Sequence, residues 1–324
     1  MVKAIRIHET GGPEVLKWED VTVGDPGPGE IRVRTAAVGL NFIDVYFRTG
    51  LYAGPDLPLT LGFEGSGTVD AVGDGVADIG VGDRVAYVNP IGSYTQARIM
   101  PADRAVVLPD SIDFETAAAM MLKGLTAHYL LRRTYRVQSG DTVLIHAAAG
   151  GVGLIACQWA KALGATVIGT VGSDEKAEQA RAHGCDHPIV YSRENFTDRV
   201  REITDGKGVP VVYDSIGKST FEGSIDCLSP LGMMVSFGNA TGPVPPIDPA
   251  LLATKGALFF TRPTLFAYVG PRADLLSAAG ELFDVVGSGK VRIEVNQRWP
   301  LAEAAEAHRA LEARKTTGST ILTV

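Results

Sequence analysis

Hydrophobic and polar residues alternate along the first 120 or so residues of the chain. In short apolar stretches such as 31–34 and 84–87 the side chains alternate between two faces, which predicts β-strands with one face in water. Turn sequences separate these stretches, among them Gly73-Asp74-Gly75 and Gly82-Asp83. Because one wet face is typical of antiparallel pairing, we predict a largely antiparallel β domain here.

From about residue 124 the pattern changes to compact apolar runs separated by segments of helical spacing. Six runs are candidate strands: 142–146, 166–170, 188–190, 209–213, 233–237 and 258–260. Helices are predicted between them, two of them over 152–163 and 174–182. Strands that alternate with helices indicate βαβ units, so we predict an α/β, doubly wound parallel sheet, the Rossmann arrangement.

The last 60 or so residues predict two amphipathic helices, over 273–287 and 301–313, and a strand over 319–324. A lone strand must pair with a sheet elsewhere, so we expect the tail to return to the N-terminal β domain. The predicted domains are therefore 1–123 with 263–324, and an inserted Rossmann domain at 124–262. We expect a ligand-binding cleft between them.

A glycine-rich loop, Ala148-Ala149-Gly150-Gly151-Val152-Gly153, follows the first predicted strand of this sheet and opens a helix. Gly150 and Gly153 fit the pattern G-x-G-x-x-G, whereas Ala148 stands at the place of its first glycine. Backbone without side chains lets a pyrophosphate approach the helix N–H groups, and the helix dipole favours its charge. The loop predicts a dinucleotide site, and an ordinary strand-to-helix turn is the alternative.

The end of the next predicted strand indicates which dinucleotide binds. NAD-binding proteins usually have an acidic side chain there, whereas this chain has Gly172, followed by Ser173-Asp174-Glu175-Lys176. We therefore predict NADPH, with Ser173 and Lys176 at its 2′-phosphate. One alternative takes Asp174 or Glu175 as the ligand of the ribose hydroxyls. The two acids also have a structural explanation, because Ser173 can cap a helix and acidic residues in the first turn suit the helix dipole. Another alternative makes Lys176 a solvated surface lysine.

The composition narrows the class of protein. The 324 residues carry 30 basic and 37 acidic side chains, a net charge of −7, which weighs against nucleic acid as a partner. The three separated cysteines favour a reducing compartment, and no apolar run reaches the roughly 18 residues of a membrane helix, so we expect a cytoplasmic protein. The predicted β domain has no cysteine for a zinc site, and we interpret His183, Cys185 and His187 as a polar loop.

Several segments together resemble the zinc-free medium-chain dehydrogenase/reductases, and most closely the zeta-crystallin-like NADPH-dependent quinone oxidoreductases. The segments are 8–16 (HETGGPEVL), 41–44 (NFID), 122–126 (LKGLT), 146–164, 212–215 (VYDS) and 235–239 (VSFGN). The likeness covers nearly the whole chain. It implies that the β domain is GroES-like and catalytic, that the cofactor is NADPH, and that the protein forms a homodimer.

The resemblance also implies cofactor-binding residues. Asn41 would lie near the nicotinamide ribose, Gly150, Gly151 and Val152 at the pyrophosphate, Gly172, Ser173, Lys176 and Tyr191 around the adenosine phosphate, and Ser215, Phe237, Gly238 and Arg314 along the cleft. There are structural alternatives for two of these residues. Asn41 could cap a helix starting at Phe42, and Tyr191 could be an aromatic residue at the end of a strand. As catalytic residues we expect Tyr46 and Tyr52 near the acceptor, with packing in the β domain as the alternative.

We therefore predict an enzyme that reduces quinones with NADPH, by hydride or electron transfer and without a metal. Without a Lewis acid an unactivated ketone is a harder substrate than a quinone, whose reduced form delocalises its charge. Reduction of the C=C bond of enals or enones is the nearest alternative. A non-catalytic, NADPH-binding or RNA-binding crystallin-like protein is another alternative. The net charge argues against the RNA-binding version, for which Arg132, Arg133 and Arg136 could form a local basic patch.

Overall fold

The computed structural model describes all residues, 1–324, which divide into two compact units. The first unit comprises Met1–Leu125, Val269–Gly287 and Ile293–Val324, and the second comprises Thr126–Tyr268 and Ser288–Arg292. The domain limits that the sequence suggests, 1–123 with 263–324 and 124–262, stay a prediction.

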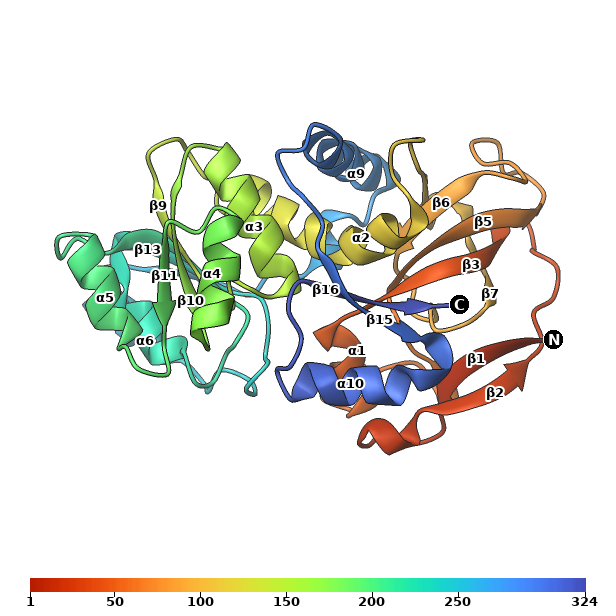
Figure 1. Ribbon diagram of the computed structural model, residues 1–324, viewed down its shortest axis with the longest axis horizontal. Helices are drawn as coiled ribbons and strands as arrows, with labels where there is room; N and C mark the ends of the chain where they lie inside the picture. Colours follow the sequence, from red (N-terminus) through yellow and green to blue (C-terminus); the bar gives the residue numbers. More distant parts are fainter. The chain divides into compact units, whose positions relative to one another are not determined.

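The first unit is built on two sheets, of three and seven strands (Figure 1). Its strands are β1 (Val2–Ile7), β2 (Lys17–Val21), β3 (Glu30–Leu40), β4 (Leu59–Thr60), β5 (Glu64–Val72), β6 (Arg84–Val88), β7 (Ala97–Pro101), β8 (Ala105–Val107), β15 (Val295–Pro300) and β16 (Ser319–Thr323). The small sheet has the order β2-β1-β4, and the large one β15-β16-β3-β5-β6-β8, with β7 also paired to β3. Every pair is antiparallel except β15 with β16, which confirms the largely antiparallel prediction.

The C-terminal tail returns to the first unit. Strand β16 pairs antiparallel with β3, with Ile321 opposite Gly39 and Leu322 opposite Val38. The helices of the unit are α1 (Phe42–Arg48), α2 (Phe114–Tyr129, which runs past the end of the unit at Leu125), α9 (Arg272–Gly287) and α10 (Ala304–Glu312). Leu322 packs into a buried apolar cluster with Ile5 and Leu301. The predicted tail strand therefore completes an N-terminal sheet, as expected.

The second unit holds a six-stranded parallel sheet of order β11-β10-β9-β12-β13-β14. Its strands are β9 (Thr142–Ile145), β10 (Thr166–Val171), β11 (His187–Val190), β12 (Val209–Asp214), β13 (Leu228–Ser236) and β14 (Phe259–Thr261). Val143, Leu144 and Ile145 are all buried although successive side chains of a strand point to opposite faces, so both faces of β9 are covered. The order is that of a complete doubly wound dinucleotide fold, and each predicted strand is present.

Five helices connect these strands: α3 (Gly151–Ala162), α4 (Asp174–Ala182), α5 (Phe196–Ile203), α6 (Phe221–Asp226) and α7 (Pro249–Thr254). A short helix, α8 (Leu265–Tyr268), follows the last strand. Helices α3 and α4 contact each other and strand β10, while α5 contacts α6 (Figure 1). The strand order reverses between β9 and β12, and in open α/β sheets ligands bind outside the carboxyl ends of the strands at such a point. None of the chain's helices is long and apolar enough to cross a membrane.

Candidate functional site

The glycine loop lies between β9 and α3, as predicted. Gly150 is the N-cap of α3 in an extended conformation (φ −81°, ψ 175°), and as a glycine it has no side chain to cap the first N–H groups of the helix. A Cβ at Gly153 would lie 2.2 Å from the carbonyl oxygen of Ala147, so only glycine lets the helix approach the loop this closely. Such a helix start suits an anionic diphosphate, because its N–H groups and dipole favour negative charge.

Ten of the predicted cofactor residues lie at one edge of the parallel sheet, because each follows the carboxyl end of a strand. Gly150, Gly151 and Val152 follow β9, Gly172, Ser173 and Lys176 follow β10, Tyr191 follows β11, Ser215 follows β12, and Phe237 and Gly238 follow β13. The loops touch: a Cβ at Gly238 would lie 2.4 Å from the carbonyl oxygen of Ser215. The fold thus brings these residues together, and their contacts with a cofactor stay a prediction.

The segment after β10 has the cap that the sequence predicts. The Ser173 hydroxyl accepts the backbone N–H of Lys176 at 3.4 Å, and Asp174 lies in the first turn of α4. Both carboxylate oxygens of Asp174 accept hydrogen bonds from Arg193, at 2.7 and 2.6 Å, and this guanidinium lowers the pKa of Asp174. Asp174 therefore has a structural partner, and Arg193 adds a cation to this edge that the sequence analysis did not single out.

A buried polar network underlies the same edge. The Ser224 hydroxyl donates to Asp214 at 2.8 Å. Because its one proton is used there, it accepts from Nε2 of His146 at 2.9 Å. The other ring nitrogen of His146, Nδ1, then accepts from the Thr170 hydroxyl at 2.8 Å. Burial lowers the pKa of His146, in keeping with this neutral form. The other oxygen of Asp214 accepts the backbone N–H groups of residues 216 and 217. The network joins the ends of β9, β10 and β12 and holds the loop after Ser215.

The predicted catalytic tyrosines lie together in the first unit. The ring centroids of Tyr46, on α1, and Tyr52, in the following loop, are 5.0 Å apart at 57°, and Phe47 packs edge-on to Tyr52. Tyr46 is buried. Arg314 is exposed two residues after the end of α10, with φ +58°, and its backbone N–H donates to the carbonyl of Leu311. The catalytic role of the tyrosines and the cofactor contact of Arg314 stay predictions.

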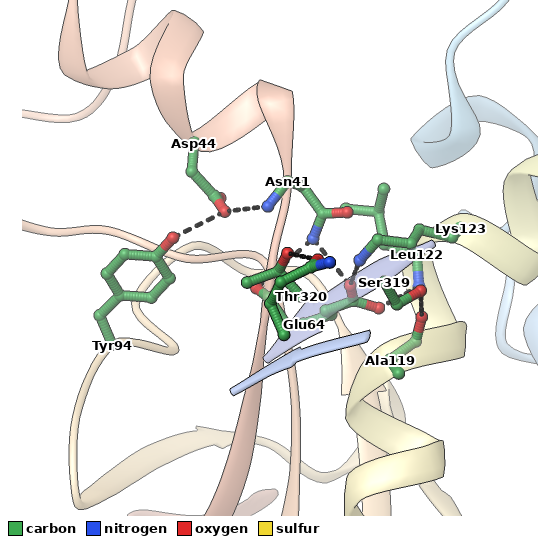
Figure 2. A network of polar contacts seen from close by, with 11 residues as sticks. Asn41, Asp44, Glu64, Tyr94, Ala119, Leu122, Lys123, Ser319 and Thr320 are labelled. Atoms are coloured by element: carbon green, nitrogen blue, oxygen red, sulfur yellow. Dashed lines mark hydrogen bonds and ion pairs between the residues drawn. The ribbon is translucent and has the colours of Figure 1, made fainter. Parts of the chain in front are cut away.

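Asn41 is the N-cap residue of α1, which is the alternative the sequence offered for it. Its backbone N–H donates to the carboxylate of Asp44 at 2.9 Å, and Tyr94 donates to the same oxygen at 2.9 Å (Figure 2). The Tyr94 oxygen lies 3.0 Å from Nε2 of His308, whose Nδ1 lies 2.9 Å from Arg48. Because Arg48 can only donate, Nδ1 accepts and Nε2 carries the proton toward Tyr94.

The buried position of this chain of hydrogen bonds shifts two pKa values in opposite directions. Desolvation raises the pKa of Asp44 to about 7, against the hydrogen bonds from Asn41 and Tyr94, which lower it. Desolvation and the charge of Arg48 lower the pKa of His308 to about 3. At neutral pH His308 is therefore neutral, which agrees with its place between a donor and an acceptor.

Sequence reasoning missed the residues that surround Asn41. Its side-chain Nδ2 donates to Glu64 at 2.7 Å, and Glu64 forms an ion pair with Lys123 at 2.8 Å. Two charged residues inside apolar segments, at Leu61–Gly65 and Met120–Leu125, were the available signal. No comparable signal in the sequence marks Tyr94 and His308, which are 214 residues apart and meet only in the folded chain.

The side chains form no group of three or more His, Cys, Asp or Glu residues that could hold a metal ion. From the sequence alone we interpret His183, Cys185 and His187 as a polar loop. In the structure Nδ1 of His183 lies 2.7 Å from the carbonyl oxygen of Gln179, and Cys185 is buried.

Comparison with known proteins agrees with this architecture. The family described as alcohol dehydrogenase GroES-like domain matches residues 27–131, and the zinc-binding dehydrogenase family matches residues 151–274. A quinone oxidoreductase from Pseudomonas aeruginosa is 56% identical over 323 residues, 99% of each chain. The crystal structure of Escherichia coli quinone oxidoreductase complexed with NADPH superposes with a TM-score of 0.98 at 49% identity, covering 99% of this chain and 100% of the other.

A 2-haloacrylate reductase from Burkholderia is 48% identical over 330 residues, 99% of each chain. The GroES-like and Rossmann predictions are thereby confirmed. These full-length similarities, on a six-stranded Rossmann sheet joined to a GroES-like β unit, show that the chain belongs to the medium-chain dehydrogenase/reductase family, among the zeta-crystallin-like quinone oxidoreductases.

Proposed function

We propose that this chain is an NADPH-dependent reductase of quinones. The observation that carries the proposal is the carboxyl edge of the parallel sheet, where five strands end in loops holding the residues expected at NADPH. The similarity to quinone oxidoreductases, one of them complexed with NADPH, supports the same cofactor and the same substrate class.

The residues of this edge fit the cofactor. The glycine-capped start of α3 offers N–H groups to the pyrophosphate. Around the 2′-phosphate, Gly172 contributes no carboxylate, Ser173 contributes a hydroxyl and Lys176 a cation. A second cation, Arg193, forms an ion pair with Asp174, the residue that follows Ser173. This collection of groups favours a phosphate over a bare ribose hydroxyl.

The reduced nicotinamide supplies the hydride, or the electrons, that the acceptor takes up. The protein binds and orients the two reactants and keeps water from the reacting atoms. For the acceptor we propose contact with the aromatic pair Tyr46 and Tyr52, whose rings offer a flat surface and hydroxyl groups. A quinone suits such a site, because its reduced form spreads the negative charge over the ring and can take protons from water.

Reduction of an activated C=C bond is the second candidate, favoured by the similarity to a 2-haloacrylate reductase. It would use the same cofactor site and differ only in the atom that receives the hydride. A non-catalytic NADPH-binding protein would keep the cofactor site and show no turnover with either acceptor.

The deciding experiment follows NADPH oxidation by the purified chain with benzoquinone and with an enone or 2-haloacrylate under identical conditions. We expect kcat/KM for the quinone to exceed that for the C=C substrates by at least about tenfold. A reversed ratio would establish the second candidate. Binding of NADPH without oxidation by any acceptor would refute a catalytic function.

We also propose a homodimer, as the family resemblance implies. The 34.2 kDa chain should elute with twice that mass in size-exclusion chromatography with light scattering. The mass of a single chain would refute the dimer and leave the proposed reaction untouched.

A further inference from the structure

Asn41 is held between two carboxylates, both inaccessible to solvent (Figure 2). Asp44 accepts its backbone N–H at 2.9 Å, and Oε1 of Glu64 accepts its side-chain Nδ2 at 2.7 Å. The position is fixed by the fold: Asn41 directly follows β3, Glu64 begins β5, and the two strands pair with Gly39 opposite Glu64. A Cβ at Gly39 would lie 2.2 Å from Oε1 of Glu64, so glycine is needed for this approach.

Glu64 is in turn held by α2. Nζ of Lys123 donates to the same Oε1 at 2.8 Å, and the backbone N–H of Leu122 donates to Oε2 at 2.6 Å. The side chain of Lys123 is only 7% exposed and that of Glu64 not at all. Removing one partner of a buried ion pair leaves an uncompensated charge, which is strongly unfavourable. The geometry of the Glu64 carboxylate therefore depends on Lys123.

These contacts fix the direction of the Asn41 amide. Its NH₂ group is committed to Glu64, because a carboxylate can only accept. Figure 2 shows the amide oxygen pointing away from both carboxylates. A flipped amide would bring its oxygen against Oε1 of Glu64, which is electrostatically unfavourable. Asn41 thus offers a ligand a hydrogen-bond acceptor, the group that a hydroxyl recognises.

We propose that Glu64 and Lys123 are positioning residues: through Asn41 they hold an amide oxygen toward a ribose hydroxyl of the nicotinamide half of NADPH. The inference rests on the proposed function. A purely structural role, in which the ion pair only joins β5 to α2, would change the stability of the protein without any dependence on Asn41.

A double-mutant cycle separates the two roles. NADPH affinity is measured by calorimetry for wild type, Asn41→Ala, Lys123→Met and the double variant, and 2′,5′-ADP serves as a probe of the adenosine half alone. We expect each single variant to bind NADPH roughly tenfold more weakly, and the double variant to bind no more weakly than Asn41→Ala. The affinity for 2′,5′-ADP should stay unchanged throughout. Lys123→Arg, which keeps the charge, should recover most of the affinity for NADPH.

Independent, additive losses in the double variant would overturn the proposal, and so would unchanged NADPH affinity in Lys123→Met. An equal loss of NADPH and 2′,5′-ADP would also overturn it, because the damage would then be general. If Lys123→Met does not fold, Lys123→Gln takes its place in the cycle with the same expectations. A wild-type protein that binds neither probe would instead refute the proposed function, so the two failures are distinguishable.

Discussion

Gly172 and Tyr191 lie against each other at the ends of two neighbouring parallel strands. A Cβ at Gly172 would lie 2.9 Å from the hydroxyl oxygen of Tyr191, and the backbone N–H of Tyr191 donates to the carbonyl of Val171 at 3.1 Å. An acidic side chain at Gly172, as NAD-binding proteins have there, would have to displace the tyrosine. Tyr191 is 47% exposed, so its side chain has room to turn away from a larger residue at position 172. Substitutions of Gly172 can therefore test the proposed preference of this site for NADPH.

Gly172→Asp should weaken NADPH binding by at least about tenfold and leave NADH binding unchanged or improved. The reason is that the new carboxylate repels the 2′-phosphate and can accept from a ribose hydroxyl. Fluorescence titration with both nucleotides measures the effect. Gly172→Asn is the matched control, since it displaces Tyr191 to the same extent without charge. An equal loss in the Asp and Asn variants would show that charge is not the cause.

Lys176→Ala should weaken NADPH binding by about tenfold and leave NADH binding nearly unchanged, because only NADPH has the 2′-phosphate that the ammonium would contact. Lys161→Ala is a suitable control, because Lys161, on α3 of the same unit, forms an ion pair with Asp186. Titration of each variant with both nucleotides gives the comparison. Equal losses for NADPH and NADH in Lys176→Ala would contradict the assignment.

Much of the second unit could be predicted from the sequence because its signals are local. The helix expected over 174–182 has those bounds in the structure, since Ser173 caps it and Asp174 and Glu175 fill its first turn. The strand–loop–helix around Gly150 follows from an apolar run and a glycine cluster only a few residues apart.

The surroundings of Asn41 could not be predicted in this way. Asn41 meets Glu64 only because β3 and β5 pair in one register, and Glu64 meets Lys123 across a further 59 residues. Periodicity indicates which residues are buried, but not which distant side chains meet. The parallel pairing of β15 with β16 escaped prediction for the same reason.

Two of the three glycines of the loop, Gly151 and Gly153, should differ in what their replacement damages. Gly151→Val should abolish measurable NADPH binding with little loss of stability, because it places a side chain where the pyrophosphate is proposed to approach. Gly153→Ala should instead cost about 1–3 kcal/mol of unfolding free energy, because its Cβ would lie 2.2 Å from the carbonyl oxygen of Ala147. Urea unfolding and NADPH titration of both variants test this. Undiminished binding by Gly151→Val would remove the loop from the site.

Asp44 and His308, which are joined through Tyr94, predict opposite pH dependences of the unfolding free energy. Because the two contributions oppose each other in the wild type, variants are needed to observe either one. The pKa of Asp44 is raised from 3.8 to about 7, so between these values the unfolded chain has released a proton that the folded protein retains, and stability falls as pH rises. The pKa of His308 is lowered from 6.5 to about 3, so between these values the unfolded chain binds a proton that the folded protein excludes, and stability rises with pH. The two contributions oppose each other between pH 3.8 and 6.5.

In Asp44→Asn only the His308 contribution should therefore remain. The unfolding free energy of this variant relative to wild type should rise by up to about 1.4 kcal/mol per pH unit across this range. His308→Gln, which can still accept from Arg48 and donate to Tyr94, should show the opposite slope. Urea unfolding at several pH values measures both differences, and subtracting wild type removes the titration of all other groups. Parallel curves for the three proteins would mean that neither group titrates differently in the folded and unfolded states. Slopes of one sign in both variants would contradict a raised pKa of Asp44 together with a lowered pKa of His308.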